Sequence, residues 1–406
     1  IQLSHVKQEI DRLDKIDEDV ALKKSYSEVD YETIHDFVSE ALSQFRRDVV
    51  IIAEIAKRQT VVKDYILRED NAPSFSYQHL TDAAMSYVKA GGKSLRPAVL
   101  MFCCGLVGGD ENTALPVAGA IELYHTFTLV HDDIIDQDDL RRGVPTVHAD
   151  FYQRAKDDMG YDDATARHYG LSLGILAGDV QQGWAASLMT KLYSEFNHPA
   201  GLALNLVNEL FGRVQGLLLE GETLDIMLSQ APIADVTEEK VLDMLWKKTG
   251  VLYEFAGRAG AAIGLGVEDI RDERVEKIAT FTGNCGTAFQ IQDDILGLVG
   301  NEKQLGKPIG SDIKEGKRTI IVLNTLPKMN ENEKTTVLAA LGNRDATLEQ
   351  IQAATQLMID YGGVDYAREM AQSQVQEALM LIEDIPDSEY KDTLKSWAYY
   401  MIEREF

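Results

Sequence analysis

Apolar residues recur at intervals of three and four along most of the chain. Two early runs show the spacing clearly: Leu3, Val6, Ile10 and Leu13, and then Ile34, Phe37, Val38, Leu42 and Phe45. This spacing predicts amphipathic α-helices that bury one apolar face. Period-two alternation of β-branched residues, which would predict strands, is scarce. We therefore expect an all-α fold.

Turn and capping signals divide the helical pattern into segments. The stretch REDNAPS at 68–74 interrupts the periodicity and predicts a connection between helices. Pro232 and the acidic residues after it predict a turn that leads into a helix. Thr347 with Gln350 predicts a capping box at the start of another.

The composition indicates a large acidic protein. Its 406 residues are 45% hydrophobic and 26% charged, which is ample for a sizeable core. We divide the chain into a helical extension of unknown role, residues 1–70, and a main domain, residues 71–406. The 66 acidic and 40 basic residues give a net charge of −26, which disfavours nucleic acid and anionic membranes as partners because phosphates would be repelled. An anionic ligand therefore needs a local basic cluster or a metal.

Cysteine usage and the start of the chain bear on its compartment. The three cysteines, Cys103, Cys104 and Cys285, are an odd number and two are adjacent, which favours a reducing environment. The sequence opens without a basic and then apolar leader, and no apolar run approaches the ~20 residues that cross a bilayer. We expect a cytoplasmic protein without a transmembrane segment.

The segment LVHDDIIDQDDLRRG, residues 129–143, concentrates negative charge. On a helix, Asp132 and Asp136 share a face, whereas Asp133 is rotated by about 100°. Like charges at such a spacing repel by about 0.2–0.5 kcal/mol unless a cation lies between them. Carboxylates suit Mg²⁺, which keeps several waters and bridges to phosphates. A solvated acidic helix end explains this segment equally well.

A second acidic pair changes that balance. The stretch FQIQDDILG at 289–297 places Asp293 and Asp294 among apolar residues. Apolar flanks argue against a simply solvated face, because buried carboxylates need partners. Two helices that each carry an acidic pair can face each other and hold metal ions, and through them a diphosphate.

Basic residues supply the complementary charge. In KAGGKSLRP, residues 89–97, a glycine pair before a helix start can present backbone amides, Lys93 and Arg96 to an anion. The two glycines could instead simply end the preceding helix. A Walker A loop is excluded because its first glycine would fall on Tyr87.

Further cations surround the acidic motifs in sequence. Arg141 and Arg142 can bind phosphate oxygens in bidentate geometry. The remaining candidates lie near polar or glycine breaks, where each alone would more often be a surface lysine: Lys247, Lys248, Lys307 and Lys317.

Taken in order, GGKSLRP, HDDIID with DLRRG, KKTG, FQIQDD and GKPIGSDIKEGKRT resemble the motifs of the trans-isoprenyl diphosphate synthases, or polyprenyl synthetases. LAGD at 176–179 and YGGVDYAREMA at 361–371 match as well. The resemblance runs from about Tyr77 to the C-terminus. It implies an all-α bundle around a deep central cavity, a homodimer, and head-to-tail condensation of isopentenyl diphosphate with dimethylallyl, geranyl or farnesyl diphosphate.

The resemblance also implies a role for each matched residue. Three Mg²⁺ ions on the allylic diphosphate would be held by Asp132, Asp133, Asp136 and Asp293, with Asp294 behind them. The same diphosphate would contact Arg141, Lys248, Lys307 and Lys317. Isopentenyl diphosphate would be held by Lys93, Arg96, His125 and Arg142. The oxygens of Thr249 and Gln290 would lie by the reacting carbons, and the departing diphosphate would be the base. The residues expected to be catalytic are Asp132, Asp136, Asp293, Lys248, Thr249 and Gln290.

Two stretches depart from the family pattern. The second aspartate motif usually ends in a third aspartate, and here that position is Gly297, which puts the outer metal contacts in doubt. The middle motif reads GETLD at 221–225, and we assign it no role. His131 is expected to be a core residue rather than a ligand.

Product length depends in this family on large residues just before the first motif. Tyr124, Thr128 and Asp132 lie on one helical stripe, and Phe127 lies about 7.5 Å along the axis from Asp132. One aromatic at the fifth position before the motif, with a small neighbour, is similar to archaeal-type geranylgeranyl diphosphate synthases. We therefore expect a twenty-carbon product, with Tyr124 able to set the pocket floor higher or deeper.

Several other functions share part of this pattern. A farnesyl or geranylfarnesyl diphosphate synthase differs only in product length. A class I terpene cyclase would not need Lys93, Arg96 and His125 for a second diphosphate. A metal phosphohydrolase using His131 and Asp132 leaves the second acidic motif unexplained. A non-catalytic partner subunit fits poorly with two largely intact metal motifs.

Overall fold

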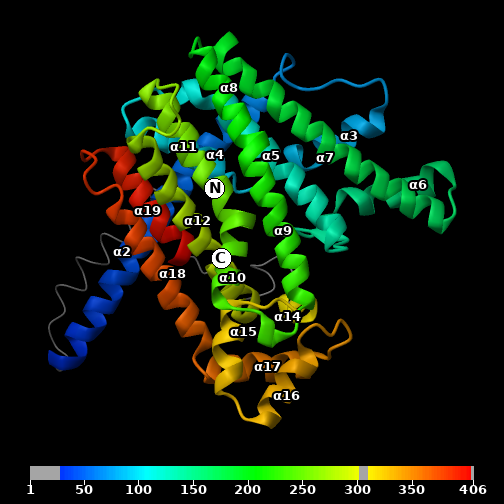
Figure 1. Cartoon of the computed structure of the whole chain (residues 1–406), viewed down its shortest axis with the longest axis vertical. Coiled ribbons are helices and arrows are strands. Elements are labelled where there is room, and N and C mark those ends of the chain that lie inside the picture. Colours follow the sequence, from blue (N-terminus) through cyan, green and yellow to red (C-terminus); the bar gives the residue numbers. More distant parts are fainter. Residues whose placement is uncertain (1–27, 301–309, 404–406) are drawn as a thin grey trace.

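The computed structural model describes residues 28–300 and 310–403 (Figure 1), and the side chains in these ranges apart from those of 28–43 and 311. The helix expected from the apolar spacing of residues 3–13, and Lys307, lie outside the described residues. Most of the described chain is helical and very little of it is strand, so the all-α prediction is confirmed.

The elements follow one another with short connections. The helices are α2 (Glu28–Ile66), α3 (Gln78–Ala90), α4 (Leu95–Leu106), η1 (Glu111–Ala114), α5 (Leu115–Ile135), α6 (Val147–Met159), α7 (Asp163–Ser194), α8 (Ala200–Asn208), η2 (Glu209–Val214), α9 (Gln215–Gln230), η3 (Ile233–Asp235), α10 (Glu238–Leu245), η4 (Trp246–Gly250), α11 (Val251–Leu265), α12 (Glu273–Val299), α14 (Ser311–Glu315), α15 (Ile320–Thr325), η5 (Leu326–Lys328), α16 (Glu331–Ala340), α17 (Leu348–Asp360), α18 (Gly363–Met380) and α19 (Glu389–Glu403). Two short strands, β1 (Leu140–Arg141) and β2 (Val144–Pro145), pair antiparallel after α5.

The core surrounds the long central helices. α5 packs against α7 and α4, and α11 packs against α12 and α4 (Figure 1). The sequences of α4, α5 and α11 are apolar around most of their circumference, as expected for helices that other helices enclose. Cys103, Cys104 and Cys285 are free and buried in α4 and α12, where they act as small apolar residues.

Several helix boundaries follow the capping signals in the sequence. Thr347 and Gln350 form the predicted capping box at the start of α17. The turn after Pro232 is the short helix η3, and Thr237 then caps α10 by accepting from the backbone N–H of Lys240. The REDNAPS stretch forms an irregular connection between α2 and α3, as predicted.

The second half of α2 belongs to the same core as the bundle. Its buried apolar residues are Ile51, Ile55, Val62, Tyr65 and Ile66. The helix packs against α4, α5 and α19, while its first turns project away from the bundle (Figure 1). The division at residue 70 therefore does not coincide with an edge of this core, and a separate role for residues 1–70 stays a prediction.

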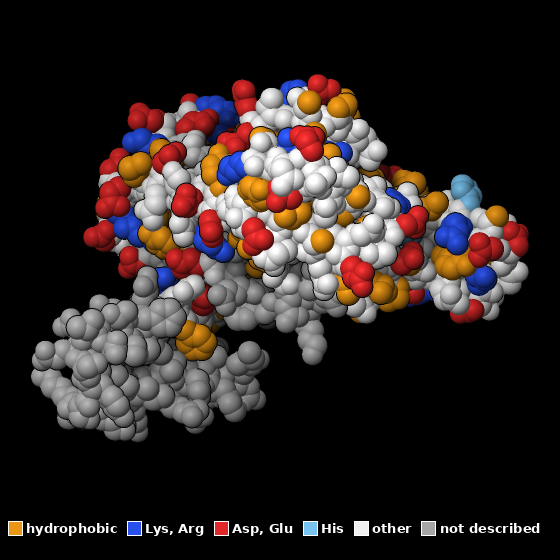
Figure 2. Space-filling model, turned by 90° about the horizontal axis from the view of Figure 1, so that it is seen from below, with side chains coloured by type: hydrophobic (Ala, Val, Ile, Leu, Met, Phe, Trp, Pro, Cys, Tyr) orange, Lys and Arg blue, Asp and Glu red, His pale blue; other side chains and the backbone are white. Residues whose placement is uncertain are grey.

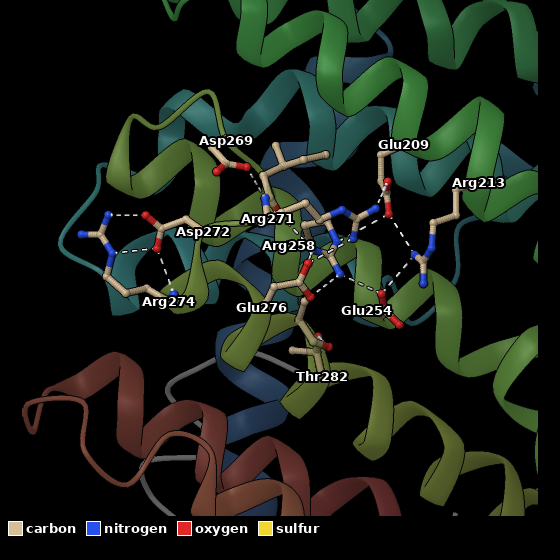
Figure 3. Close-up of polar contacts among 12 residues, drawn as sticks. Glu209, Arg213, Glu254, Arg258, Asp269, Arg271, Asp272, Arg274, Glu276 and Thr282 are labelled. Atoms are coloured by element: carbon tan, nitrogen blue, oxygen red, sulfur yellow. Dashed lines mark hydrogen bonds and ion pairs between the residues drawn. The ribbon is translucent and has the colours of Figure 1, made fainter.

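A buried ionic network joins α11 to its neighbours (Figure 3). Arg258 on α11 is 1% exposed and donates to Glu254 at 2.8 Å and to Glu276 on α12 at 2.5 Å. Arg271, in the loop before α12, donates to Glu209 on η2 at 2.5 Å, so the network connects three helices and this loop. Arg258 also lowers the pKa of Glu276. Removing one member of such a buried set leaves its partners uncompensated.

The surface mixes charges of both signs. The face in Figure 2 carries acidic, basic and apolar side chains interspersed, so the negative charge is not gathered on this face. Within the described ranges, no helix combines the length and the hydropathy that a membrane crossing requires.

Candidate active site

One cavity of about 580 Å³ brings most of the predicted site residues together. Its walls come from α3, α4, α5, α9, η4, α11, α12, α14, the two short strands and the loops beside them. The predicted residues that line it are Lys93, Arg96, His125, Thr128, Asp132, Asp136, Arg141, Arg142, Lys248, Thr249, Gln290, Asp293, Asp294 and Lys317. Asp133, Phe127 and Tyr124 are not among its lining residues.

The first acidic wall stands at the C-terminal end of α5. Asp132 lies in the last turn and Asp136 follows the helix, where the helix dipole already presents negative charge. The pKa of Asp132 is raised to about 7, chiefly by burial; Lys248 lowers it, and Glu222 and Asp136 raise it further. The local excess of negative charge is therefore a place where a cation would be stabilised.

The second acidic wall is formed by α12 and α14. Asp293 lines the cavity, and the pKa of Asp294 is raised well above its ordinary value by burial and then by the nearby Asp312. The Asp312 carboxylate occupies the space over Gly297, so that a Cβ built at 297 would overlap it. The carboxylate missing from the end of this motif is thus replaced in space by one from α14.

Asp133 does not line the cavity. Its side chain is 1% exposed; it accepts a hydrogen bond from the Tyr87 hydroxyl and one from Arg141 Nε at 2.7 Å. The rotation of about 100° per residue explains why it points elsewhere than Asp132. The structure therefore places Asp133 where it orients Arg141, which lines the cavity, and does not bring it together with the other predicted metal ligands.

The donor set fits Mg²⁺ held together with a diphosphate. Among the side chains described, no three His, Cys, Asp or Glu residues form a closed metal site by themselves. Mg²⁺ is typically bound by one or two carboxylates, waters and substrate phosphates rather than by an all-protein cage. Asp132 and Asp294, two carboxylates with raised pKa values that line the same cavity, provide such an incomplete set.

Arg96 and His125 form a pair on another wall of the cavity. Arg96 Nη1 lies 3.1 Å from His125 Nε2, and its guanidinium lies over the Tyr253 ring at 4.6 Å. The pKa of His125 is lowered well below its usual value by burial and then by Arg96. A neutral His125 can therefore accept from Arg96 and fix its direction.

Sequence reasoning missed two residues beside this pair. Ser94 Oγ donates to Glu122 Oε1 at 2.8 Å, and both residues line the cavity. Burial raises the pKa of Glu122, and the Ser94 hydrogen bond and Arg96 lower it. Glu122 lies three residues before His125, so helical spacing alone could have predicted that the two side chains are neighbours on α5.

The motif KKTG forms the π-helical turn η4, a type of bulge often found at functional sites. Lys248 Nζ lies 2.6 Å from Asp225 and 2.8 Å from Glu222. Burial would lower the pKa of Lys248, but these carboxylates raise it overall, so the lysine stays charged. The middle motif, to which we assigned no role, therefore holds Lys248 in place.

Thr249 and Gln290 form a hydrogen bond in the cavity wall. Thr249 Oγ1 donates to Gln290 Oε1 at 2.9 Å, which links η4 to α12. Lys317 Nζ lies 2.9 Å from Asp312, so this lysine is also positioned by a carboxylate. Each cation of the predicted allylic site that the structure describes therefore has an acidic side chain that orients it.

An aromatic layer lies behind the cavity on α5. Phe127 is 2% exposed and packs edge-on against Tyr124, with ring centroids 4.8 Å apart, while Thr128 lines the cavity itself. Phe211 on η2 packs against Tyr124 at 5.7 Å, a contact that sequence reasoning missed. His131 Nε2 lies 3.2 Å from the Ile175 carbonyl oxygen on α7.

An all-α bundle that surrounds one cavity with two acidic walls and several oriented cations defines the isoprenoid synthase class of fold. Residues 77–358 match the model of the polyprenyl synthetase family, and the chain belongs to that family. It is accordingly a trans-prenyltransferase.

Curated relatives cover most of this chain. The geranylgeranyl diphosphate synthase of Sulfolobus acidocaldarius is 37% identical over 79% of this chain and 86% of its own. The geranylfarnesyl diphosphate synthase of Natronomonas pharaonis is 33% identical over 87% of this chain and 97% of its own.

Solved structures share the fold. The geranylgeranyl pyrophosphate synthetase of Pyrococcus horikoshii superposes with a TM-score of 0.74 and 32% identity, covering 87% of this chain and 98% of the other. The geranylgeranyl pyrophosphate synthase of Corynebacterium glutamicum, complexed with isoprenyl diphosphate and magnesium, gives a TM-score of 0.71 and 25% identity, covering 87% of this chain and 98% of the other.

Proposed function

We propose that the chain condenses isopentenyl diphosphate head-to-tail with an allylic diphosphate to give mainly geranylgeranyl diphosphate. The single observation that carries this proposal is that Asp132 and Asp293 line one cavity together with six predicted cations: Lys93, Arg96, Arg141, Arg142, Lys248 and Lys317. The geranylgeranyl diphosphate synthases among the relatives support the product.

The allylic diphosphate is assigned to the acidic walls. Asp132, Asp136 and Asp293 would hold three Mg²⁺ ions, and Asp133 would act instead by orienting Arg141. Mg²⁺ bound there would neutralise the negative charge that develops on the leaving diphosphate. The cations that would contact the same diphosphate are Arg141, Lys248, Lys317 and, outside the described residues, Lys307.

Isopentenyl diphosphate is assigned to the start of α4. Lys93, Arg96 and Arg142 would bind its phosphate oxygens, and neutral His125 would keep Arg96 directed at them. The N-terminus of α4 points backbone N–H groups at the same region, which favours an anion there. This second anion site separates the proposed synthase from a terpene cyclase.

The reacting carbons would meet between the two diphosphates. The C–O bond of the allylic diphosphate breaks, the double bond of isopentenyl diphosphate attacks the resulting cation, and a diphosphate oxygen accepts the proton that is lost. Thr249 and Gln290 present oxygens that can stabilise positive charge beside this position. The buried apolar and aromatic wall excludes water, which would otherwise capture the cation.

The aromatic layer on α5 would limit product length. A growing chain that passes Thr128 meets Phe127 and then Tyr124, which supports a twenty-carbon product. A twenty-five-carbon product is the second candidate, since a geranylfarnesyl diphosphate synthase is among the relatives.

A cytoplasmic homodimer completes the proposal. Ile175 and Leu176 on α7 are 49% and 47% exposed, an apolar pair suited to a subunit contact. Light scattering coupled to size exclusion chromatography would test the dimer, which requires twice the chain mass.

The function is tested by supplying the purified protein with Mg²⁺, isopentenyl diphosphate and each allylic primer, and separating the products by length. The expected result is geranylgeranyl diphosphate, formed only when both substrates are present. Cyclised hydrocarbon from an allylic diphosphate alone would indicate a terpene cyclase, phosphate release alone a phosphohydrolase, and complete inactivity a non-catalytic subunit.

A further inference from the structure

Two side chains of α2 reach the loop that links α3 to α4, where Gly91, Gly92, Lys93 and Ser94 line the cavity. Lys63 Nζ donates to the carbonyl oxygen of Lys89 at 2.7 Å, and Gln59 Nε2 donates to the carbonyl oxygen of Gly92. Both donors come from a helix that precedes the residues matched by the family model.

The loop is also held from its other side. Arg142 Nη1 donates to the carbonyl oxygen of Gly91 at 2.7 Å. Gly91 has φ +77°, a left-handed conformation that lets the chain leave α3 sharply and turn toward α4. Three carbonyl oxygens within four residues, at 89, 91 and 92, are thus bound by side-chain donors.

The placement of Lys63 has an electrostatic consequence. Lys89 is one residue from the end of α3, where unpaired carbonyls and the helix dipole present negative charge. This helix end adjoins the subsite assigned above to isopentenyl diphosphate, so its negative charge would oppose binding. The Lys63 ammonium offsets that negative charge and donates a hydrogen bond to the carbonyl oxygen of Lys89.

We propose that Lys63 and Gln59 are positioning residues for the isopentenyl diphosphate subsite, so that α2 is part of the functional site and not merely a packing helix. This inference rests on the proposed function. The two side chains fix the loop so that Lys93 and the start of α4 face the diphosphate. Their loss should therefore affect the binding of isopentenyl diphosphate and not that of the allylic substrate.

The test compares Lys63→Met and Gln59→Leu with Lys57→Met, a matched control because Lys57 is an exposed lysine on the same helix. We expect the KM for isopentenyl diphosphate to rise about tenfold in Lys63→Met and Gln59→Leu, while the allylic KM and kcat change by less than about twofold. Lys63→Arg keeps a charged donor and should restore most of the affinity, and the control should match the wild type.

Calorimetric binding of isopentenyl diphosphate without Mg²⁺ gives a second readout that does not depend on turnover. The affinity for isopentenyl diphosphate should fall in Lys63→Met and in Gln59→Leu by the same factor by which the KM rises. If Lys63→Met fails to fold, Gln59→Leu alone decides.

Two results would overturn the inference. One is affinity for isopentenyl diphosphate equal to that of Lys57→Met; the other is an equal rise of both KM values, which a purely structural role would cause. A wild-type chain that binds isopentenyl diphosphate but forms no product would instead contradict the proposed function, and the binding comparison would still decide the role of α2.

Discussion

The Asp312 carboxylate lies over Gly297, in the space that a side chain at position 297 would occupy. α14 thereby supplies a carboxylate at the end of the second aspartate motif, and the same carboxylate holds Lys317 at 2.9 Å. A side chain at 297 would therefore require the Asp312 carboxylate to move.

Replacing Gly297 with alanine should displace Asp312 and with it Lys317. We expect kcat/KM for the allylic diphosphate to fall about tenfold, the effect of losing one oriented cation. Gly216→Ala is the matched control, since nothing lies within 4 Å of a Cβ built there. Equal steady-state parameters for the two variants would show that the position of Asp312 does not matter.

Phe127→Ala should lengthen the product. Removing the ring opens space toward Tyr124, so the product distribution from farnesyl diphosphate should move beyond twenty carbons when chain lengths are separated. Phe281→Ala removes a comparably buried ring that packs on Trp397, and both changes should destabilise the fold by about 3–5 kcal/mol. An unchanged distribution in Phe127→Ala would remove this residue as the length determinant.

His125 should make the stability of the protein pH-dependent. Its folded pKa lies well below the unfolded value near 6.5, so the unfolded state binds the proton more readily at intermediate pH. The free energy of unfolding should therefore rise with pH up to about 6.5 and level off above it, through this residue. Urea unfolding at pH 5 and 7 measures how the free energy of unfolding changes with pH in the wild type and in His125→Gln. An equal change in the two proteins would mean that His125 does not contribute to the pH dependence.

Arg258→Met should destabilise the fold without changing the chemistry. The substitution removes the buried arginine that pairs with Glu254 and Glu276, which keep only the more exposed Arg213 and Arg271 as partners. We expect it to lower the free energy of unfolding by about 3–5 kcal/mol. Arg274→Met removes an exposed ion pair with Asp272 and should change stability by less than about 1 kcal/mol. Chemical denaturation separates the two cases, and kcat per folded molecule should be normal in both. Similar stability losses would show that burial of the network contributes little.

Much of the fold could be predicted because the spacing of apolar residues along the chain indicates helices locally. The apolar periodicity gives the all-α class, and the Thr347–Gln350 capping box and the break at 68–74 lie where the sequence signals place them. The chain's membership of the polyprenyl synthetase family likewise follows from motifs in a fixed order.

The unpredicted parts of the site depend on contacts between distant segments. Helical spacing predicts that Asp133 and Asp132 point in different directions. Only the fold shows that the Asp133 carboxylate binds Arg141 and Tyr87. The approach of Asp312 to Gly297 likewise depends on how α14 packs against α12, which no local pattern encodes.

The middle motif and α2 give a similar lesson. Asp225 was noted without a role, because its partner Lys248 lies 23 residues away in the chain. In the sequence, Lys63 is one of many charged residues on an amphipathic helix. Its contact with the end of α3 is visible only in the fold.

The account depends most on Asp132 and Asp293 acting together on one diphosphate, and calorimetry with inorganic pyrophosphate tests this directly. We predict that the wild type binds pyrophosphate only with Mg²⁺ present, and that Asp132→Asn and Asp293→Asn each weaken binding at least about tenfold. The exposed control Asp158→Asn should bind as the wild type does. Full Mg²⁺-dependent binding in either Asp132→Asn or Asp293→Asn would contradict the two-walled site.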